Sequence, residues 1–183
     1  MKISRNFFGG AVIVLLPKLF YDIRGRFIKT FHTGLFEELG LPVDWREEFY
    51  SISKKGVIRG MHYQSPPEDH HKMVYCLSGK VLDVILDLRD GSPTYGSHVS
   101  IEISADEGEI LIIPSGFAHG FCTLSDETIM QYKVSSIYSP EHDTGVLWNS
   151  FGCTWPYDQP IISDRDTKFP PLASINPPFK YEE

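Results

Sequence analysis

Short runs in which apolar and polar residues alternate recur along almost the whole chain, separated by Gly, Pro, Ser and Asp, and they restrict the possible folds most. Alternation with a period of two is typical of strands with one buried face. Many such strands between turn residues indicate a β-sandwich or barrel and argue against alternating strands and helices. The sequence therefore predicts an all-β fold, a jelly roll of roughly eight or more strands.

The clearest strand is expected at residues 80–88, where successive side chains alternate between two faces. One face is entirely apolar, and the other carries Asp83 and Asp87. Two interpretations stay open. Either both carboxylates are solvated, or their face lines a cavity, in which case Asp83 supports a buried base or cation. Further strands are expected at residues 11–16, 27–31, 49–53, 72–77, 98–103, 109–113 and 129–134.

The segments outside these strands predict one short helix and an irregular C-terminal end. Residues 33–39 favour a helix, which Thr33 can cap and Gly40 can end. Six of the 13 prolines lie in the last 28 residues, so this end is expected to wrap the barrel as irregular chain or a short helical turn. Residues 1–183 are predicted to form a single domain.

Composition and charge exclude several classes of partner. The 183 residues carry a formal net charge of −7, and a nucleic-acid duplex requires a broad basic face, so no nucleic-acid partner is expected. A small phosphorylated ligand needs only a few local cations. The apolar run at residues 7–16 is too short to cross a bilayer, and no membrane partner is expected. Cys76, Cys122 and Cys153 form an odd set without C-x-x-C spacing, which argues against a disulfide framework and favours the reducing cytoplasm.

Ionisable residues gather at four places inside otherwise apolar, glycine-punctuated segments. Arg59 and His62 share one segment, and Lys72, His119 and Tyr132 stand in three others. A charge or an imidazole is costly to bury unless it has a partner or a ligand. The set is therefore a candidate active site, although each member alone also fits a structural role.

The segment that ends at His119 has the spacing Gly-x5-Pro-x-Gly-x2-His, which resembles the second motif of the cupin superfamily of small jelly-roll barrels. The first cupin motif is present only in part, because Gln64 stands where a metal-binding cupin has a second histidine. A metal site would require His62, Gln64, Glu68 and His119 to converge, and glutamine is a poor metal ligand. We expect neither a metal nor another cofactor.

A second pair of histidines, His70 and His71, follows two prolines. Adjacent residues in extended chain project to opposite faces, so the pair does not form a joint site. Both side chains are expected to be solvated in a surface loop.

Several segments together, in order along the chain, closely resemble the dTDP-4-dehydrorhamnose 3,5-epimerase family. The resemblance implies a metal-free cupin-type double-stranded β-helix, usually a homodimer. It further implies an isomerase that inverts one or both carbons beside the ketone of a nucleotide-linked 4-keto-6-deoxy sugar. The segments are FYDIRG at 20–25, GVIRGMHYQ at 56–64, DVILDLR at 83–89 with SPTYG at 92–96, IPSGFAHGF at 113–121, YSPEH at 138–142 and IISDRD at 161–166.

The resemblance assigns the three tasks of this chemistry. A proton beside a carbonyl is acidic because its carbanion is delocalised as an enolate, so the site needs a base, a cation and an acid on the opposite face. His62 matches the family's base, Lys72 the cation and Tyr132 the acid. Asp166 matches the carboxylate that pairs with the base, and Asp164 is the competing assignment.

The resemblance also implies a binding site for the nucleotide. Arg59 and His119 match positions near the diphosphate, and Tyr138 matches the aromatic residue that stacks on the base. Arg24 matches an arginine that reaches the nucleotide across the dimer interface, where Phe20 is the other residue borrowed from a neighbour. The complete expected binding set is Phe20, Arg24, Glu47, Phe49, Arg59, His119, Tyr138 and Asp143.

The chain departs from the family pattern at positions associated with the nucleotide. Glu47, Glu48 and Phe49 stand where Gln-Asp-Asn is typical, Lys29 where an acidic residue is usual, and Tyr75 where a basic residue is common. Carboxylates in place of amides replace hydrogen-bond donors by acceptors, so recognition of thymidine does not follow from the resemblance.

The predicted function is epimerisation of a nucleoside-diphosphate 4-keto-6-deoxy sugar at C3, C5 or both. The favoured reaction converts dTDP-4-dehydro-6-deoxyglucose to dTDP-4-dehydrorhamnose. One alternative is the same chemistry on a CDP-, GDP- or UDP-linked sugar, or at one carbon only. Others are a metal-dependent cupin enzyme and a non-catalytic sugar-binding cupin.

Overall fold

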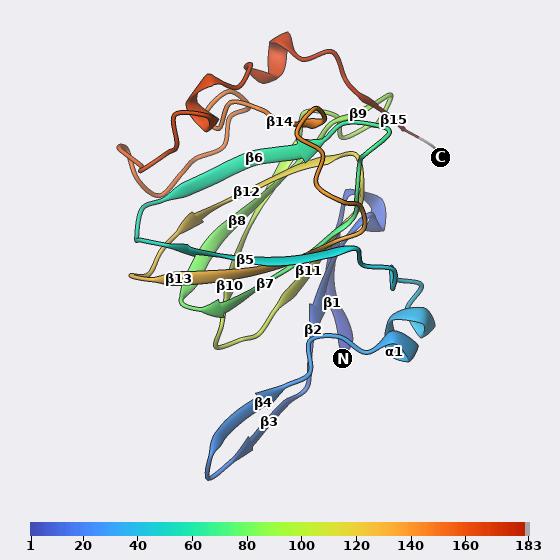
Figure 1. Cartoon of the computed structure of the whole chain (residues 1–183), viewed down its shortest axis with the longest axis vertical. Helices are drawn as coiled ribbons and strands as arrows, with labels where there is room; N and C mark the ends of the chain where they lie inside the picture. Colours follow the sequence, from blue (N-terminus) through green and yellow to red (C-terminus); the bar gives the residue numbers. More distant parts are fainter. Residues whose placement is uncertain (182–183) are drawn as a thin grey trace.

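The alternating runs fold into two antiparallel sheets that face each other across an apolar interior (Figure 1). The computed structural model describes residues 1–181. The first sheet contains, in spatial order, β1 (Lys2–Phe7), β2 (Val12–Leu16), β11 (Ile110–Ile113), β7 (Lys72–Ser78), β13 (Thr128–Val134) and β5 (Glu47–Ser53). The second contains β10 (His98–Ser104), β8 (Lys80–Asp87), β12 (Phe117–Thr123), β6 (Ile58–Gln64) and β14 (Asp143–Gly145). Strands β5 to β8, and again β10 to β14, alternate between the sheets, which confirms the predicted jelly roll.

Smaller elements flank the two sheets. The hairpin of β3 (Leu19–Asp22) and β4 (Gly25–Ile28) extends away from the barrel (Figure 1). The short strand β9 (Arg89–Asp90) pairs in parallel with β15 (Phe179–Lys180). The helical elements are α1 (Thr33–Glu38) and the 3-10 turns η1 (Phe8–Gly10), η2 (Asp166–Lys168) and η3 (Leu172–Ser174). Within residues 1–181 no helix combines the length and the apolar composition that crossing a bilayer requires.

The structure corrects three expectations about local structure. β1 is missing from the predicted strands because it is an edge strand with almost all its side chains exposed, so its sequence lacks the alternation. The strand expected at residues 27–31 is β4, which ends at Ile28. Thr33 does not cap α1. His32 does so, and its Nδ1 accepts the amide N–H of Leu35 at 3.3 Å.

Both faces of β8 are buried, which decides between the two interpretations that the alternation left open. Val81 and Ile85 belong to the core between the sheets. Val84 and Leu86 face the other way and pack with Phe179, under a C-terminal segment that lies across the outer face of the five-stranded sheet (Figure 1). The expected wrapping of the barrel by the C-terminal end is therefore confirmed.

Glycines let β6 and β12 approach closely at the middle of this sheet. A Cβ atom on Gly120 would lie 2.8 Å from the carbonyl oxygen of Arg59 and 2.7 Å from Sδ of Met61. Gly60, on the facing strand, has a φ of +147° and lies against the backbone of Gly120. The pairing that results places residue 119 directly opposite residue 62, so two histidine side chains share the interior face.

Candidate active site

A cavity of about 440 Å³ opens between the two sheets. It collects most of the residues that the sequence singles out, from both sheets and from the segments beyond β13. The residues that line it are Glu47, Phe49, Ser51, Arg59, His62, Tyr63, Gln64, His70, Lys72, His119, Phe121, Tyr132, Val134, Tyr138, Asp143 and Arg165.

His62 lies on β6 and is held by a carboxylate from the C-terminal segment. Its Nε2 is 2.9 Å from Oδ1 of Asp166, whose Oδ2 accepts the amide N–H of Gly60 at 3.1 Å. Burial raises the pKa of Asp166, but the hydrogen bonds from His62 and Gly60 outweigh it and leave the pKa below its usual value. The ionised carboxylate fixes the Nε2–H tautomer of neutral His62, which leaves Nδ1 free of a proton, as a general base requires.

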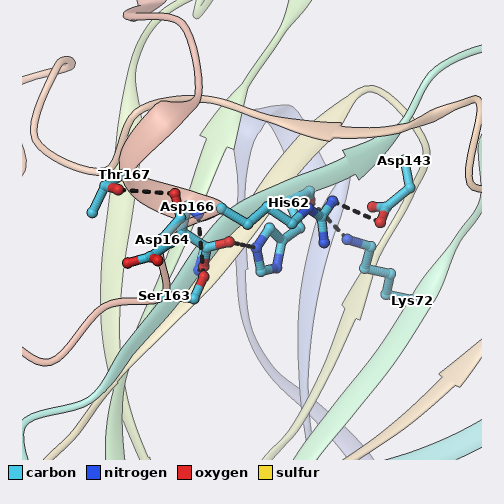
Figure 2. A network of polar contacts seen from close by, with 9 residues as sticks. His62, Lys72, Asp143, Ser163, Asp164, Asp166 and Thr167 are labelled. Carbon is cyan, nitrogen blue, oxygen red and sulfur yellow. Dashed lines mark hydrogen bonds and ion pairs between the residues drawn. The ribbon is translucent and has the colours of Figure 1, made fainter.

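The structure distinguishes between the two carboxylates that the sequence left as alternatives. Figure 2 shows the carboxylate of Asp166 directed at the ring of His62, whereas that of Asp164 points away from it. Asp166 is buried at the start of η2, and Asp164 is exposed. The amide N–H of Asp166 donates to Oγ of Ser163 at 3.1 Å, which anchors the turn that carries the carboxylate.

Lys72 approaches His62 from the neighbouring sheet (Figure 2). Its ammonium group donates to the backbone carbonyl of His62 at 2.8 Å, and only 8% of the residue is exposed. Burial lowers the pKa of Lys72 to about 8, although the negative charges of Asp143 and Asp83 act in the opposite direction. A cation whose charge is poorly solvated interacts strongly with any negative charge that develops beside it.

Tyr132 lies on β13, and its ring has two aromatic neighbours. Phe49, directly opposite on β5, stacks on it with 4.9 Å between centroids and 14° between planes. The ring of His119 meets it edge to face at 6.3 Å. Burial raises the pKa of Tyr132 well above its usual value of 10, so the phenol keeps its proton at every physiological pH.

Asp83 and His119 form a buried pair on β8 and β12. Oδ2 of Asp83 lies 2.8 Å from Nε2 of His119, and neither side chain has appreciable contact with solvent. Burial raises the pKa of Asp83, against the lowering influence of His119 and Lys72. The alternative in which Asp83 is solvated is therefore wrong. Asp87, its neighbour on the same face, is also buried, and bonds instead to Arg89, Ser92 and Thr94.

The mouth of the cavity carries the polar groups expected at the nucleotide. Arg59 is exposed, and its Nε donates to Oγ of Ser53 at 2.9 Å. Tyr138 is 56% exposed, and its amide N–H donates to Oε1 of Glu47 at 3.0 Å. Glu47 therefore ties the segment after β13 to the edge strand β5.

Arg165 is a cavity residue that the sequence analysis did not single out. Its Nη2 lies 2.6 Å from Oδ2 of Asp143, which fixes that carboxylate at the cavity wall. Its position in the IISDRD segment, between the two aspartates that are alternative partners of His62, is the sequence signal for Arg165.

The prediction for His70 is wrong, because a solvated side chain in a surface loop was expected. His70 lines the cavity, with its Nδ1 at 3.0 Å from Oγ of Ser136 and at 3.3 Å from Nε2 of Gln64. Burial, with smaller contributions from the positive charges of Lys72 and His71, lowers the pKa of His70 to about 3, so the imidazole is neutral. The chain turns inward after its two prolines, and local sequence pattern does not reveal this.

Two expected binding residues do not reach the cavity of their own chain. Phe20 and Arg24 lie on the hairpin of β3 and β4, and neither lines the cavity. Arg24 sits at the turn and pairs with Asp22 at 2.5 Å. Their expected contribution to the site of a neighbouring chain stays a prediction.

The residues considered for a metal site are engaged otherwise. Nε2 of Gln64 donates to the backbone carbonyl of Glu68 at 2.6 Å. In the part of the chain that the structure describes, residues 1–181, no group of three or more His, Cys, Asp or Glu side chains is arranged to hold a metal ion.

Comparison with known proteins identifies the family. Residues 10–174 match the model of the dTDP-4-dehydrorhamnose 3,5-epimerase family. The chain belongs to this family. It is therefore an isomerase of the epimerase type, and the resemblance drawn from the sequence motifs is confirmed.

Individual members of the epimerase family resemble the chain over most of its length. The dTDP-4-dehydrorhamnose 3,5-epimerase of Shigella flexneri is 44% identical over 158 residues, which cover 85% of this chain and 87% of the relative. The crystal structure of the Bacillus anthracis enzyme with TDP and PPi bound has a TM-score of 0.90 and 40% identity, covering 92% of this chain and 98% of that one. The dTDP-6-deoxy-D-glucose-3,5-epimerase of Legionella pneumophila, in complex with dTDP-4-keto-L-rhamnose, has a TM-score of 0.92 and 34% identity, covering 97% of each chain. These neighbours support the expected cupin type of jelly roll.

Proposed function

We propose that the chain inverts C3, C5 or both in a nucleoside-diphosphate 4-keto-6-deoxy sugar, with dTDP-4-dehydro-6-deoxyglucose as the favoured substrate and dTDP-4-dehydrorhamnose as the product. The observation that carries the proposal is a single cavity that holds a carboxylate-oriented imidazole, a buried ammonium group and a protonated phenol. A base, a cation and an acid are the three groups that inversion beside a ketone requires.

In the proposed mechanism His62 removes a proton from a carbon beside the ketone. The electron pair of the broken C–H bond moves into an enolate, whose negative oxygen is stabilised by Lys72. Tyr132 donates its phenolic proton to the opposite face of the same carbon and forms the inverted C–H bond. The imidazolium then loses its proton to solvent and the phenolate regains one, so the cycle consumes no net proton.

Asp166 supports the base in two ways. Its negative charge favours protonation of His62, and its hydrogen bond holds the ring in one orientation. Because Oδ2 is bonded to the backbone of β6 at Gly60, the carboxylate cannot turn away without losing a second hydrogen bond.

The mouth of the cavity is the proposed nucleotide site. We propose that Arg59, exposed at the mouth, and His119, buried in the cavity wall, bind the diphosphate, and that Asp143 and Glu47 accept hydrogen bonds from the nucleoside. Tyr138 and Phe49 offer half-exposed aromatic faces for a base. Glu47 and Phe49 stand where the family typically has amides, so a CDP-, GDP- or UDP-linked sugar is the second candidate substrate.

We also propose that two chains assemble into a homodimer. The hairpin of β3 and β4 carries exposed apolar side chains outside the barrel, including Phe20, Tyr21 and Phe27. A two-stranded ribbon with an apolar surface gains stability by packing against another chain. Arg24 at its turn would then reach the cavity of the partner.

The test is incubation in deuterium oxide with dTDP-, CDP-, GDP- and UDP-linked 4-keto-6-deoxy sugars, with incorporation counted by mass spectrometry. Two deuterons in the dTDP sugar, lost in His62→Ala, are the expected result. One deuteron would limit the reaction to a single carbon, and incorporation into another sugar would reassign the nucleotide. Absence of exchange on all four substrates would overturn the proposal in favour of a binding protein or a metal-dependent enzyme.

A further inference from the structure

The ring of Phe49 stacks on the ring of Tyr132, the proposed acid. The two strands β5 and β13 pair in register at these positions, so Phe49 and Tyr132 are direct cross-strand neighbours. Their rings are nearly parallel, 14° apart, with 4.9 Å between centroids. A stacked pair of rings in this arrangement is favourable beyond the apolar area that it buries, so each ring restricts rotation of the other.

The ring of Tyr132 has a second aromatic neighbour, His119, at 6.3 Å between centroids. His119 meets the ring at 66°, and the hydrogen bond to Asp83 holds that imidazole within the core. Of these two ring neighbours, His119 is buried and bonded to Asp83, whereas Phe49 is half-exposed, with 46% of the residue accessible. Phe49 is therefore the neighbour that can be replaced without disturbing the buried pair.

Phe49 supports the Tyr132 ring from the edge of the sheet. β5 is an edge strand that pairs only with β13 among the strands of the sheet, so no further strand lies behind it. Tyr132 is 9% exposed, and the Phe49 ring forms the solvent-side cover of the phenol. Removal of that ring would admit water to the face of Tyr132 and release its side-chain rotation.

We propose that Phe49 is a positioning residue for Tyr132, which holds the phenol at the angle needed to protonate the enolate from the face opposite His62. The proposal rests on the proposed function, because it assigns Phe49 to the acid half of that reaction. It separates the two halves of the mechanism: His62 and Lys72 can form the enolate without Phe49, whereas delivery of the proton with inversion needs it.

The separation can be measured in deuterium oxide with dTDP-4-dehydro-6-deoxyglucose as the probe. When His62 returns a deuteron to the face from which it took the proton, the substrate becomes labelled without inversion. When Tyr132 delivers the deuteron, the product is both labelled and inverted. Proton NMR gives the two rates separately, as loss of the C3 and C5 signals and as growth of the signals of the epimer.

For Phe49→Ala we expect the ratio of inversion to label-only exchange to fall about 10- to 100-fold at saturating substrate, because any loss of nucleotide binding lowers both rates together and leaves their ratio unchanged. Phe49→Leu, which keeps bulk in the position but has no ring to stack, should show the same imbalance. Phe49→Trp should restore the wild-type ratio. Tyr50→Ala is the matched control, because Tyr50 is the next aromatic residue of β5 but faces outward and is 63% exposed.

A second measurement needs no substrate. The absorbance change on ionisation of Tyr132 is obtained by subtracting the titration of Tyr132→Phe, and in Phe49→Ala it should appear at lower pH because water reaches the phenol. Equal loss of exchange and inversion in Phe49→Ala, or the same imbalance in Tyr50→Ala, would overturn the role of Phe49 while leaving the proposed function intact. Absence of exchange in the wild-type protein would overturn the proposed function and this role with it.

Discussion

Asp166 and His62 are 104 residues apart in sequence, yet the carboxylate of one lies 2.9 Å from the imidazole of the other. The same carboxylate also accepts the amide N–H of Gly60, two residues before His62 on β6. The C-terminal segment therefore does more than cover the barrel, since its turn η2 fixes both the strand and the side chain of the proposed base.

Replacement of Asp166 by Asn should separate orientation from charge. The amide can keep one hydrogen bond to β6 but removes the negative charge that favours protonation of His62, so kcat should fall about 100-fold, with a smaller change in KM. The measurement is steady-state epimerisation at pH 7.5.

Asp164→Asn is the control for this experiment, because it makes the same chemical change two residues away on an exposed side chain. It should leave kcat within about twofold of wild type. A comparable loss in both variants would show that the turn, and not the contact with His62, is what matters.

The pKa of Lys72, which burial lowers to about 8, predicts an alkaline limb in the activity. Below this pKa the ammonium group is charged and can stabilise the enolate oxygen; as the pH rises through about 8 the charge is lost and kcat should decline. Measurement of kcat between pH 6 and pH 10 tests this.

Lys72→Arg sharpens the test of the alkaline limb. A guanidinium stays protonated throughout this range, so the variant should have a lower kcat at pH 7 but no decline near pH 8. An alkaline limb that stays in place in Lys72→Arg would assign it to another group.

Gly120 should tolerate no side chain. A Cβ at this position would meet Sδ of Met61 at 2.7 Å and Cα of Gly60 at 2.9 Å, so Gly120→Ala forces β6 and β12 apart. We expect a loss of about 1–3 kcal/mol in the free energy of unfolding, measured by urea denaturation. Gly34→Ala, in α1, would place a Cβ at an ordinary contact distance of 3.4 Å from Cε1 of His32 and should be neutral or slightly stabilising.

Most of the strands and most residues of the candidate site were predictable because both depend on local pattern. Alternation in β8 correctly put Asp83 and Asp87 on one face of the strand, although it left open whether that face is buried, and motif spacing singled out His62, His119 and Tyr132, which line one cavity. β6 and β12 carry His62 and His119, but glycines interrupt the alternation of apolar and polar residues in both strands. The bounds of these two strands therefore could not be derived from a period of two.

The residues that sequence analysis missed are those placed by distant contacts. His70 faces the cavity because Ser136, 66 residues further on, lies against it, and Arg165 is placed by Asp143, 22 residues before it. The stacking of Phe49 on Tyr132 likewise depends on the register of two strands far apart in sequence. Such contacts are decided by chain topology, which no single segment encodes.

His70 yields a prediction for stability in acid. Its pKa is about 3 in the folded protein and about 6.5 in an unfolded chain, so between these values the unfolded state binds the proton and the folded state does not. The free energy of unfolding should therefore fall as the pH drops below 6.5, by up to about 1.4 kcal/mol per pH unit from this group. In His70→Gln, whose amide can still bond to Ser136, that part of the decline should disappear. Urea denaturation of both proteins at pH 7.5, 5.5 and 4.5 measures it: the stability of the variant relative to wild type should rise steadily toward acid, and a constant difference would mean that His70 is protonated in the folded state.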